Sequence, residues 1–323
     1  MLAILGFFKI TKDWILPSNQ TPLGALPARF RRPRVLIVGC GDVGLRAAAL
    51  LKNGSRVYAL TSSELRIADL QQHGICALTG NLDEPATLRR LAGVATHLIH
   101  MAPPPLQGRT DPRTRALVQT LQLRSSPQSV VYGSTSGVYG DCGGAWIDET
   151  QLLNPQTDRA QRRVDAEAWL NAWGSRGFPR VQVLRIPGIY ALDREGGTPR
   201  ERLQRGTPVL QATEDVFTNH IHADDLARAT VLSMWRGKTM RPLHVSDDSD
   251  MLMGDYMDWA ADLWQLPRSP RISRAQAQTA LPAMTLSFMN ESRRMQNQRL
   301  KTELRMKLRY PTVREGLHGK PVF

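Results

Sequence analysis

The stretch RVLIVGCGDVGLRAAALLKNGSRVYALT occupies residues 34–61 of a chain of 323 residues and decides its fold. It opens on the apolar run 35–38, which predicts a short buried strand, and a second apolar run follows at 57–60. Between the two runs, a glycine-rich turn leads into residues 43–53, whose apolar spacing is typical of a helix. The stretch therefore predicts a strand–turn–helix–strand unit whose two strands lie parallel.

The turn carries the glycine pattern GCGDVG. Gly39 permits the tight turn, Gly41 lets the backbone approach a pyrophosphate, and Gly44 lets the helix pack closely on the strand. The helix opens at Asp42 and Val43, where free backbone N–H groups and the helix dipole attract an anion. We expect these five residues to hold the pyrophosphate of a dinucleotide, and a purely structural turn is the alternative.

The end of the second strand bears on which dinucleotide binds. Sites specific for NAD place an acidic residue there, against the ribose 2′-hydroxyl. This chain has Thr61 at that position, followed by Ser62 and Ser63, with Arg66 nearby. The hydroxyls and the guanidinium can donate hydrogen bonds to a 2′-phosphate, which an acid would repel. We therefore expect NADP to be preferred, with NAD as the alternative and an exposed, uninvolved Arg66 as the competing interpretation.

Short apolar runs continue to alternate with helical patterns as far as residue 186. The expected strands lie at 75–78, 97–101, 130–132 and 181–186, and the expected helices at 64–72, 84–92, 113–122 and 157–173. Runs this short and apolar are typical of parallel strands that helices cover on both faces. The expected fold class is therefore α/β, a doubly wound parallel sheet of the Rossmann type.

The alternation becomes irregular after residue 186, where proline and glycine are frequent. A helix at 224–235, a strand at 242–246 and a helix at 253–264 are expected there. We interpret residues 34–186 as the dinucleotide-binding domain and residues 187–323 as a smaller, interleaved substrate-side lobe.

The N-terminal residues 1–33 and the cysteines bear on the cellular location of the protein. Residues 1–33 are expected to be an N-terminal extension and linker, in which Lys9 interrupts the opening apolar segment MLAILGFF. A membrane span needs about 20 apolar residues, so no transmembrane helix is expected, and a cleavable secretory signal is not cleanly indicated.

The three cysteines have neither a CxxC pair nor a matching histidine pattern, so neither a metal site nor a disulfide framework is expected. A cytoplasmic location fits these features.

The chain carries a net charge of +13, with 42 Lys and Arg against 29 Asp and Glu. Many of the basic residues lie at 293–309, where they alternate with leucine and methionine. We interpret that region as a helix with a solvated basic face and an apolar face packed on the domain. Nucleic-acid binding is the less favoured alternative, and a basic surface would also attract phosphorylated cofactors and substrates.

Several motifs of the chain resemble those of one enzyme family. They are the glycine turn, GNLD at 80–83, HMAP at 100–103, SVVYGSTSGVYG at 129–140, LRIPGIY at 184–190 and HIHADDLA at 220–227. Their order and spacing over residues 34–315 are similar to those of the extended short-chain dehydrogenases/reductases, within the NAD(P)-dependent epimerase/dehydratase family. This resemblance implies the doubly wound fold, a dinucleotide cofactor and a small-molecule substrate.

The resemblance also implies cofactor contacts on the neighbouring strand ends. Asn81 and Leu82 would lie against the adenine, although the family more often has an acid where Asn81 stands. Ala102 and Pro103 would line the cofactor at the end of the fourth strand.

The resemblance also implies which residues lie near the reacting groups of the cofactor and the substrate. Pro187 and Gly188 would pass near the nicotinamide. Thr135 takes the position of the hydroxyl residue that hydrogen-bonds the reacting carbonyl or alcohol. A capping or turn hydroxyl is the alternative for Thr135, because serine and threonine often serve such positions.

The chain departs from the family at its proton donor. Members that transfer hydride have Tyr-x-x-x-Lys on the helix after the fifth strand, where the phenol exchanges a proton with the substrate. Alignment through Glu167 places Arg159 on the tyrosine and Arg163 on the lysine. Arginine stays protonated and cannot take over this exchange, although Arg163 can still donate to the nicotinamide ribose.

Three interpretations of these positions stay open. Arg159 and Arg163, four apart on one helix face, could together hold a phosphate or a carboxylate. Alternatively, Arg159 is solvated and only Arg163 serves the cofactor. Tyr139 is the nearest phenol and a candidate substitute acid, with a packing role as its alternative.

Two functions are compatible with this pattern. The first is an NAD(P)-dependent oxidoreductase or epimerase that acts on a sugar-nucleotide-like or other phosphorylated substrate with altered proton chemistry. The second is a non-catalytic dinucleotide-binding sensor or scaffold protein, which the missing tyrosine favours. The sequence identifies neither the substrate nor the oligomeric state, a homodimer included.

Overall fold

The structure of the protein is a computed structural model that describes residues 32–177 and 179–323. Residues 33–323 form one compact unit. Of the expected extension and linker, 1–33, only the last two residues lie within the described part. The expected domain boundary at residue 186 falls inside the compact unit, so the proposed lobe at 187–323 is part of that unit.

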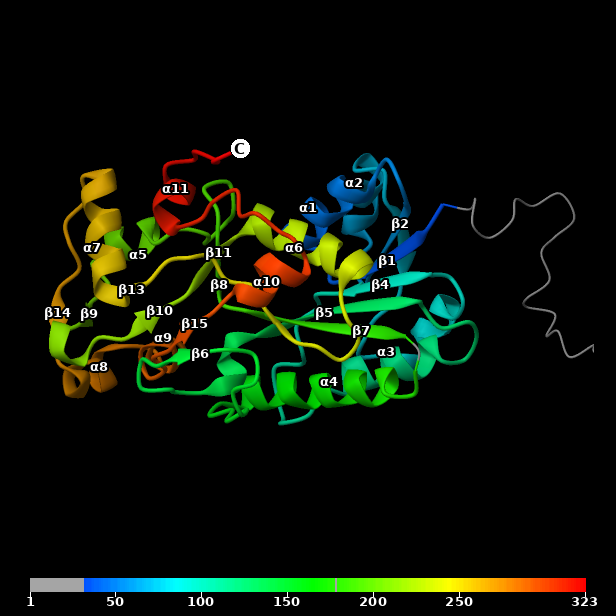
Figure 1. The fold of residues 1–323 in the computed structure, drawn as a ribbon, viewed down its shortest axis with the longest axis horizontal. Helices are drawn as coiled ribbons and strands as arrows, with labels where there is room; N and C mark the ends of the chain where they lie inside the picture. Colours follow the sequence, from blue (N-terminus) through cyan, green and yellow to red (C-terminus); the bar gives the residue numbers. More distant parts are fainter. Residues whose placement is uncertain (1–31, 178) are drawn as a thin grey trace, which may run out of the picture. The chain divides into compact units, whose positions relative to one another are not determined.

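A parallel sheet of seven strands forms the core of this unit (Figure 1). In spatial order its strands are β12 (Leu243–His244), β7 (Arg180–Ile186), β5 (Ser129–Thr135), β4 (His97–His100), β1 (Arg34–Val38), β2 (Arg56–Thr61) and β3 (Cys76–Thr79). Every pairing between them is parallel. The direction of winding reverses at β1, which has β2 on one side and β4 on the other. The expected doubly wound sheet is therefore confirmed.

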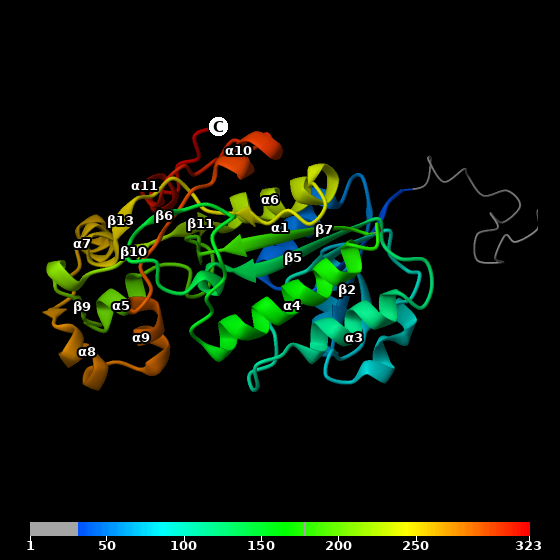
Figure 2. The ribbon, with the colours of Figure 1, turned by 60° about the horizontal axis from the view of Figure 1, so that its bottom comes forward.

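Helices cover both faces of the sheet, as Figures 1 and 2 show. One face carries α1 (Asp42–Leu51), α2 (Leu65–Gln72) and α6 (Ala223–Arg236), and the other carries η3 (Pro85–Leu91), α3 (Pro112–Leu121) and α4 (Asp158–Gly174). Val35 and Ile37 of β1 pack in the layer of α1, whereas Leu36 and Val38 pack in the layer of α3. Burial on both faces explains why this strand is a continuous apolar run in the sequence.

Two expected elements differ from the observed ones. The helix expected at 84–92 is the 3₁₀ helix η3, in which the Thr87 hydroxyl donates to the carbonyl of Glu84 at 2.7 Å. Such side-chain bonds compete with the regular helical pattern. The strand expected at 242–246 is shorter, because only Leu243 and His244 pair with β7. With α6, this strand shows that the segment after residue 186 contributes to the sheet layers.

Most of the remaining elements lie beyond the carboxyl ends of the strands (Figure 2). Four pairs of strands occur: β6 (Trp146–Ile147) with β15 (Arg294–Met295), β8 (Gly188–Tyr190) with β11 (His220–His222), β9 (Val209–Leu210) with β14 (Arg271–Ile272), and β10 (Phe217–Thr218) with β13 (Met251–Leu252). The helices are α5 (Arg200–Gln204), α7 (Met253–Trp264), α8 (Arg274–Ala280), α9 (Ala283–Met289), α10 (Gln298–Glu303) and α11 (Val313–Leu317), with the 3₁₀ turns η4 (Ser136–Tyr139) and η5 (Ala212–Glu214). The pairing of β6 with β15 brings the loop that follows β5 against the segment that follows α9.

The basic segment at 293–309 is not the single helix that the sequence analysis expected. Only α10 is helical there, and beyond it the buried residues Leu304, Met306 and Leu308 alternate with exposed ones. A period of two indicates an extended chain, so the prediction separated apolar from basic residues correctly but assigned the wrong period. Arg293 is 7% exposed and is therefore buried, not solvated.

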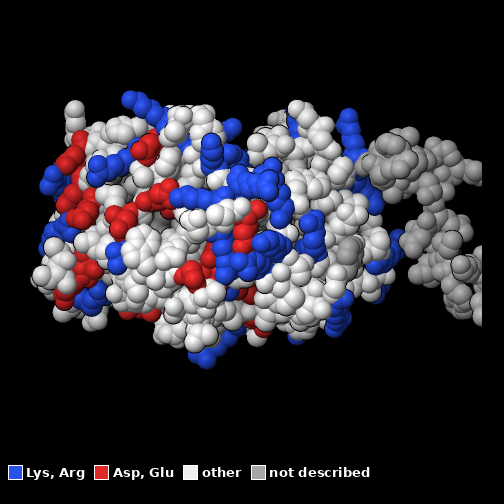
Figure 3. All heavy atoms as spheres, in the orientation of Figure 1, with Lys and Arg blue, Asp and Glu red and all other residues white. Residues whose placement is uncertain are grey.

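Basic side chains of this surface lie among acidic ones. Figure 3 shows Lys and Arg gathered over the middle of one face, where Figure 1 places α6 and α10, with acidic side chains beside them. Arg299 pairs with Glu149 at 3.3 Å, and Lys301 pairs with Asp248 at 2.6 Å. These ion pairs favour a structural interpretation of the charge over nucleic-acid binding. No helix within 32–177 and 179–323 is long and apolar enough to cross a membrane.

Candidate functional site

The glycine turn at the end of β1 has distinct space around each glycine. Gly39 has φ +85°, and a Cβ added there would overlap the backbone of Ala102. A Cβ added at Gly44 would lie 3.1 Å from the carbonyl oxygen of Gly39, so α1 packs tightly on β1. At Gly41, an added Cβ would meet nothing within 4 Å. Gly39 and Gly44 therefore serve chain packing, and the space beside Gly41 is open to a ligand.

The N-terminus of α1 lies at this space. Gly41 is the N-cap residue and has no side chain to bond the first amides of the helix, so these N–H groups can bond an anion. Asp42 in the first turn would repel an anion, but its carboxylate pairs with Arg46 at 3.1 Å and with Arg194 at 2.7 Å. Arg46 also pairs with Asp193 at 2.7 Å, which fixes the start of α1 against the loop after β8.

A cavity of about 470 Å³ lies at the carboxyl ends of β1, β2 and β4. The expected cofactor residues that line it are Gly39, Gly41, Thr61, Ser62, Arg66, Asn81, Leu82, Ala102 and Pro103. The expected residues that do not line it are Asp42, Val43, Gly44, Pro187 and Gly188. The cavity occupies the crevice at which doubly wound folds bind their ligands, on both sides of the strand where winding reverses.

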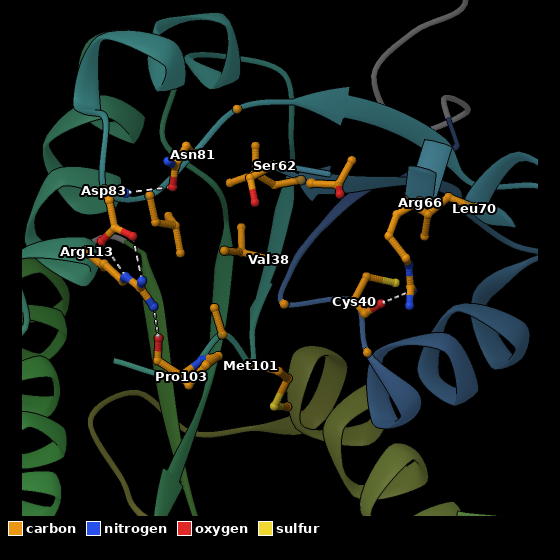
Figure 4. A pocket seen from close by; sticks show the side chains of 17 residues that line it. Val38, Cys40, Ser62, Arg66, Leu70, Asn81, Asp83, Met101, Pro103 and Arg113 are labelled. Carbon is orange, nitrogen blue, oxygen red and sulfur yellow. Dashed lines mark hydrogen bonds and ion pairs between the residues drawn. The ribbon is translucent and has the colours of Figure 1, made fainter. Parts of the chain in front are cut away.

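Arg66 reaches from α2 over the glycine turn (Figure 4). Its Nη2 donates to the carbonyl oxygen of Cys40 at 2.9 Å, and its Nε lies 3.4 Å from Asp69. The side chain is 42% exposed, so part of the guanidinium remains open to a ligand. Burial raises the pKa of the neighbouring Cys40 thiol to about 11, which leaves it protonated and unreactive near neutral pH.

An ion pair closes the opposite end of the cavity (Figure 4). Arg113 on α3 donates to both carboxylate oxygens of Asp83 at 2.6 Å and to the carbonyl oxygen of Pro103 at 3.1 Å. The hydrogen bonds from Arg113 hold the pKa of Asp83 below its ordinary value. Arg113 was not among the residues expected at the site from the sequence. The available signal was a basic residue in the first turn of a helix that follows a strand of the same sheet.

Thr135 ends β5, next to β7. Its register partner is Ile186, so Pro187 follows directly beside it at the carboxyl edge of the sheet. The Thr135 hydroxyl accepts a hydrogen bond from the Gly137 amide at 3.2 Å and thereby caps η4. A hydroxyl that accepts one bond can still donate its own hydrogen. The Thr135 hydroxyl therefore caps η4, and its hydrogen is still available for the expected bond to a substrate oxygen.

Arg163 and Arg159 on α4 have different surroundings. Arg163 Nη1 donates to the Gly133 carbonyl at 2.8 Å and to the Tyr132 hydroxyl at 3.1 Å, which ties α4 to β5. Arg159 makes no hydrogen bond or ion pair with the part of the chain that the structure describes. Partial burial, followed by the charges of Arg163 and Arg162, lowers the pKa of Arg159. The two guanidiniums lie near each other without sharing a protein partner.

Tyr139 is poorly suited to the role of substitute acid. Its side chain is 1% exposed, and its hydroxyl lies 2.6 Å from His244 Nε2 and accepts from Arg185 Nη1 at 2.7 Å. His244 Nδ1 lies 2.9 Å from the Gln296 carbonyl, which fixes Nε2 as the acceptor of the phenol proton. Burial raises the pKa of Tyr139 to about 12. Because Arg185 also forms a buried ion pair with Glu167 at 2.9 Å, Tyr139 belongs to an internal network.

The chain is similar to several known proteins. The family model of the TrkA-N domain matches residues 35–99, which cover β1 to β4. A solved structure of a functionally unknown conserved protein from Silicibacter pomeroyi DSS is 30% identical, with a TM-score of 0.76 over 89% of this chain and 97% of that chain. The structure of the dTDP-glucose 4,6-dehydratase DesIV from Streptomyces venezuelae, with NAD bound, is 18% identical, with a TM-score of 0.71 over 88% of this chain and 94% of that one.

The chain shares its fold with solved structures of epimerases and dehydratases. The fold that the motif resemblance implied is thereby confirmed. One curated relative, D-erythronate dehydrogenase from Cupriavidus necator, is 25% identical over 177 residues, 48% of this chain. The match spans 55% of that protein, about half its length. The chain thus has an NAD-binding, epimerase- or dehydrogenase-like fold.

Proposed function

We propose that this protein is an NAD(P)-dependent oxidoreductase or epimerase, with NADP preferred, that acts on a sugar-nucleotide-like or other phosphorylated substrate. The observation that carries the proposal is the open space beside Gly41, which continues into a cavity lined by Asn81 and Ala102. Backbone amides at the start of α1 would hold the pyrophosphate there. The adenosine would lie toward Asn81 and Leu82.

The preference for NADP rests on the residues at the end of β2. Thr61 and Ser62 line the cavity, and neither carries a charge that would repel a 2′-phosphate. Arg66 stands beside them with part of its guanidinium open, and a charge-assisted hydrogen bond to phosphate is stronger than one to a neutral hydroxyl. This combination favours the phosphorylated dinucleotide.

The chemistry that a bound cofactor supplies is hydride exchange at its nicotinamide ring. In the proposed site, the Thr135 hydroxyl donates a hydrogen bond to the substrate oxygen, while Arg163 holds the end of β5 against α4. Arg159 offers an unpaired positive charge to an anionic group of the substrate. The curated relative is named for D-erythronate, whose carboxylate could pair with such a guanidinium as a phosphate would.

The cofactor half of the proposal is tested by titrating the protein with NADPH and NADH while following dinucleotide fluorescence. Gly41→Val fills the open space with a side chain, so we expect the affinity for both dinucleotides to fall at least about tenfold. The melting temperature should stay near that of the wild type, because the added atoms meet no protein neighbour. Unchanged affinity in a folded variant would mean that the turn is structural only.

The catalytic half is tested with a panel that contains UDP-glucose and D-erythronate, each with NADP⁺ and NAD⁺. We expect turnover with one class of substrate and faster turnover with NADP⁺. The second candidate function, a non-catalytic dinucleotide-binding protein, is favoured by the arginine at the tyrosine position. Tight binding of NADPH without turnover of any panel member would decide for that second function.

A further inference from the structure

A carboxylate from the distal part of the chain lies beside Thr135. A Cβ added to Gly137 would lie 3.6 Å from Thr135 Oγ1 and 3.8 Å from Glu291 Oε2. The threonine hydroxyl and this carboxylate therefore approach the same point at the end of β5. Glu291 stands in the segment between α9 and β15, far from Thr135 in the sequence. Its position here results from the pairing of β15 with β6.

Glu291 also acts on the residue that replaces the family's tyrosine. The negative charge of Glu291 raises the pKa of Arg159, against the larger effects of burial and of the neighbouring arginines. Such an influence requires the two charges to be near each other. Thr135, Arg159 and Glu291 thus lie near one another, although they come from β5, α4 and the segment before β15.

The segment that carries Glu291 is held firmly in place. Its bonds to the rest of the chain are Ser292 N to Asp141 Oδ1 at 2.8 Å, Cys142 N and Gly144 N to Ser292 O at 3.0 Å, Phe217 N to Ser292 Oγ at 3.0 Å, Arg293 Nη1 to Gly140 O at 2.6 Å, and Asn219 Nδ2 to Arg293 O at 2.8 Å. A chemical group next to residues that are held by this many bonds is preorganised.

The carboxylate of Glu291 has capacity left for a ligand. Oε2 accepts from Arg293 Nη2 at 2.7 Å, and the side chain is 11% exposed. Within the described residues, Oε1 accepts no hydrogen bond, although a carboxylate oxygen can accept two. Oε1 is therefore available to a ligand, while the ion pair with Arg293 fixes the orientation of the carboxylate.

We propose that Glu291 is the general base of this active site, in the role that the helix tyrosine has in related enzymes. The inference rests on the proposed function. In the oxidation of an alcohol, the O–H bond of the substrate breaks and its proton passes to the Glu291 carboxylate as the carbonyl bond forms. The C–H bond of the carbinol carbon breaks as well, and its hydrogen passes with the bonding electron pair, as a hydride, to the oxidised cofactor. Thr135 donates a hydrogen bond to the reacting oxygen.

The test compares Glu291→Gln with Glu291→Asp and with Glu201→Gln, a control on the exposed face of α5. Oxidation of UDP-glucose and of D-erythronate by NADP⁺ is measured from pH 5 to 9, with dissociation constants for NADPH and melting temperatures for all proteins. Glu291→Gln should lower kcat at least about 100-fold. The KM of the substrate and the dissociation constant of NADPH should stay within about threefold. Glu291→Asp should recover part of the rate, and Glu201→Gln should equal the wild type.

The pH profile separates proton exchange from a structural role. In the wild type, kcat should fall at low pH as the base becomes protonated, and this limb should be absent from the residual rate of Glu291→Gln. A Glu291→Gln protein that keeps its rate, or keeps the limb, overturns the inference while the proposed function stands. A wild type that binds NADPH and turns over neither substrate overturns both. A loss of NADPH binding or of thermal stability equal to the loss of rate assigns Glu291 to structure and also overturns the inference.

Discussion

At the scale of single residues, Arg66 decides the cofactor selectivity that we propose. It lies beside the glycine turn and bonds the carbonyl oxygen of Cys40 at 2.9 Å, with part of its guanidinium open. We predict that Arg66→Ala weakens the binding of NADPH by about 1 to 3 kcal/mol, the value of a hydrogen bond to a charged group. NADH binding should change little, because NADH has no 2′-phosphate.

The matched control for this prediction is Arg34→Ala. Arg34 is exposed and begins β1, at the end of that strand opposite the cavity. The Arg34→Ala substitution removes one positive charge without changing the cofactor site. Calorimetric titration of the three proteins separates a local contact from general electrostatic attraction. Equal losses of NADPH affinity in both variants, or an equal loss for NADH, would contradict the selective contact.

At the scale of elements, α4 is attached to the sheet through Arg163 and not through Arg159. Arg163 bonds the Gly133 carbonyl and the Tyr132 hydroxyl on β5, whereas the neighbouring arginines lower the pKa of Arg159. We predict that Arg163→Met lowers the free energy of unfolding by about 1 to 3 kcal/mol, since it removes charge-assisted bonds. Arg159→Met should leave it unchanged or raise it slightly, because a repulsive charge is removed.

Denaturation with urea, monitored by circular dichroism, measures both free energies of unfolding. The two variants match each other, since they make the same substitution on the same helix, four residues apart. Equal destabilisation would show that Arg159 has a protein partner in solution. Destabilisation by Arg159→Met alone would reverse the assignment of the two residues.

The elements could be predicted where local pattern and burial agree. β1 is buried on both faces, so its apolar run identified it, and the glycine turn that follows identified the start of α1. The segment after residue 304 was misassigned because its apolar and basic residues alternate with a period of two. Glu291 was missed for another reason. Only the tertiary pairing of β15 with β6 brings it near Thr135, and no local spacing records that pairing.

At the scale of the whole molecule, buried histidines make the free energy of unfolding depend on pH. Burial lowers the pKa of His97 and His220 to about 4 and that of His100 and His244 to about 3. Each is neutral in the folded state and binds a proton more readily when unfolded. Their contribution to stability is therefore complete above pH 6.5 and is lost as the pH falls toward 3 to 4.

Buried carboxyl groups work against this trend. Burial raises the pKa of Glu149, Asp215 and Asp247, so their folded forms hold protons that the unfolded forms have released. Their contribution to stability is lost as the pH rises through the folded pKa. The net change with pH is thus a difference between opposing groups, and a single histidine is resolved only by comparison with a variant that lacks it.

His100 is the histidine best suited to that comparison. It is 1% exposed on β4, its Nε2 lies 2.9 Å from the Thr114 hydroxyl, and a glutamine amide could keep that bond. Burial, followed by the charge of Arg163, lowers its pKa to about 3. We predict that His100→Gln gains about 2 kcal/mol relative to the wild type between pH 7 and pH 5, because one pKa unit corresponds to about 1.4 kcal/mol. Urea denaturation at pH 7, 6 and 5 measures this difference. A constant difference across that range would mean that His100 is protonated in the folded state or that its strand is already open to water.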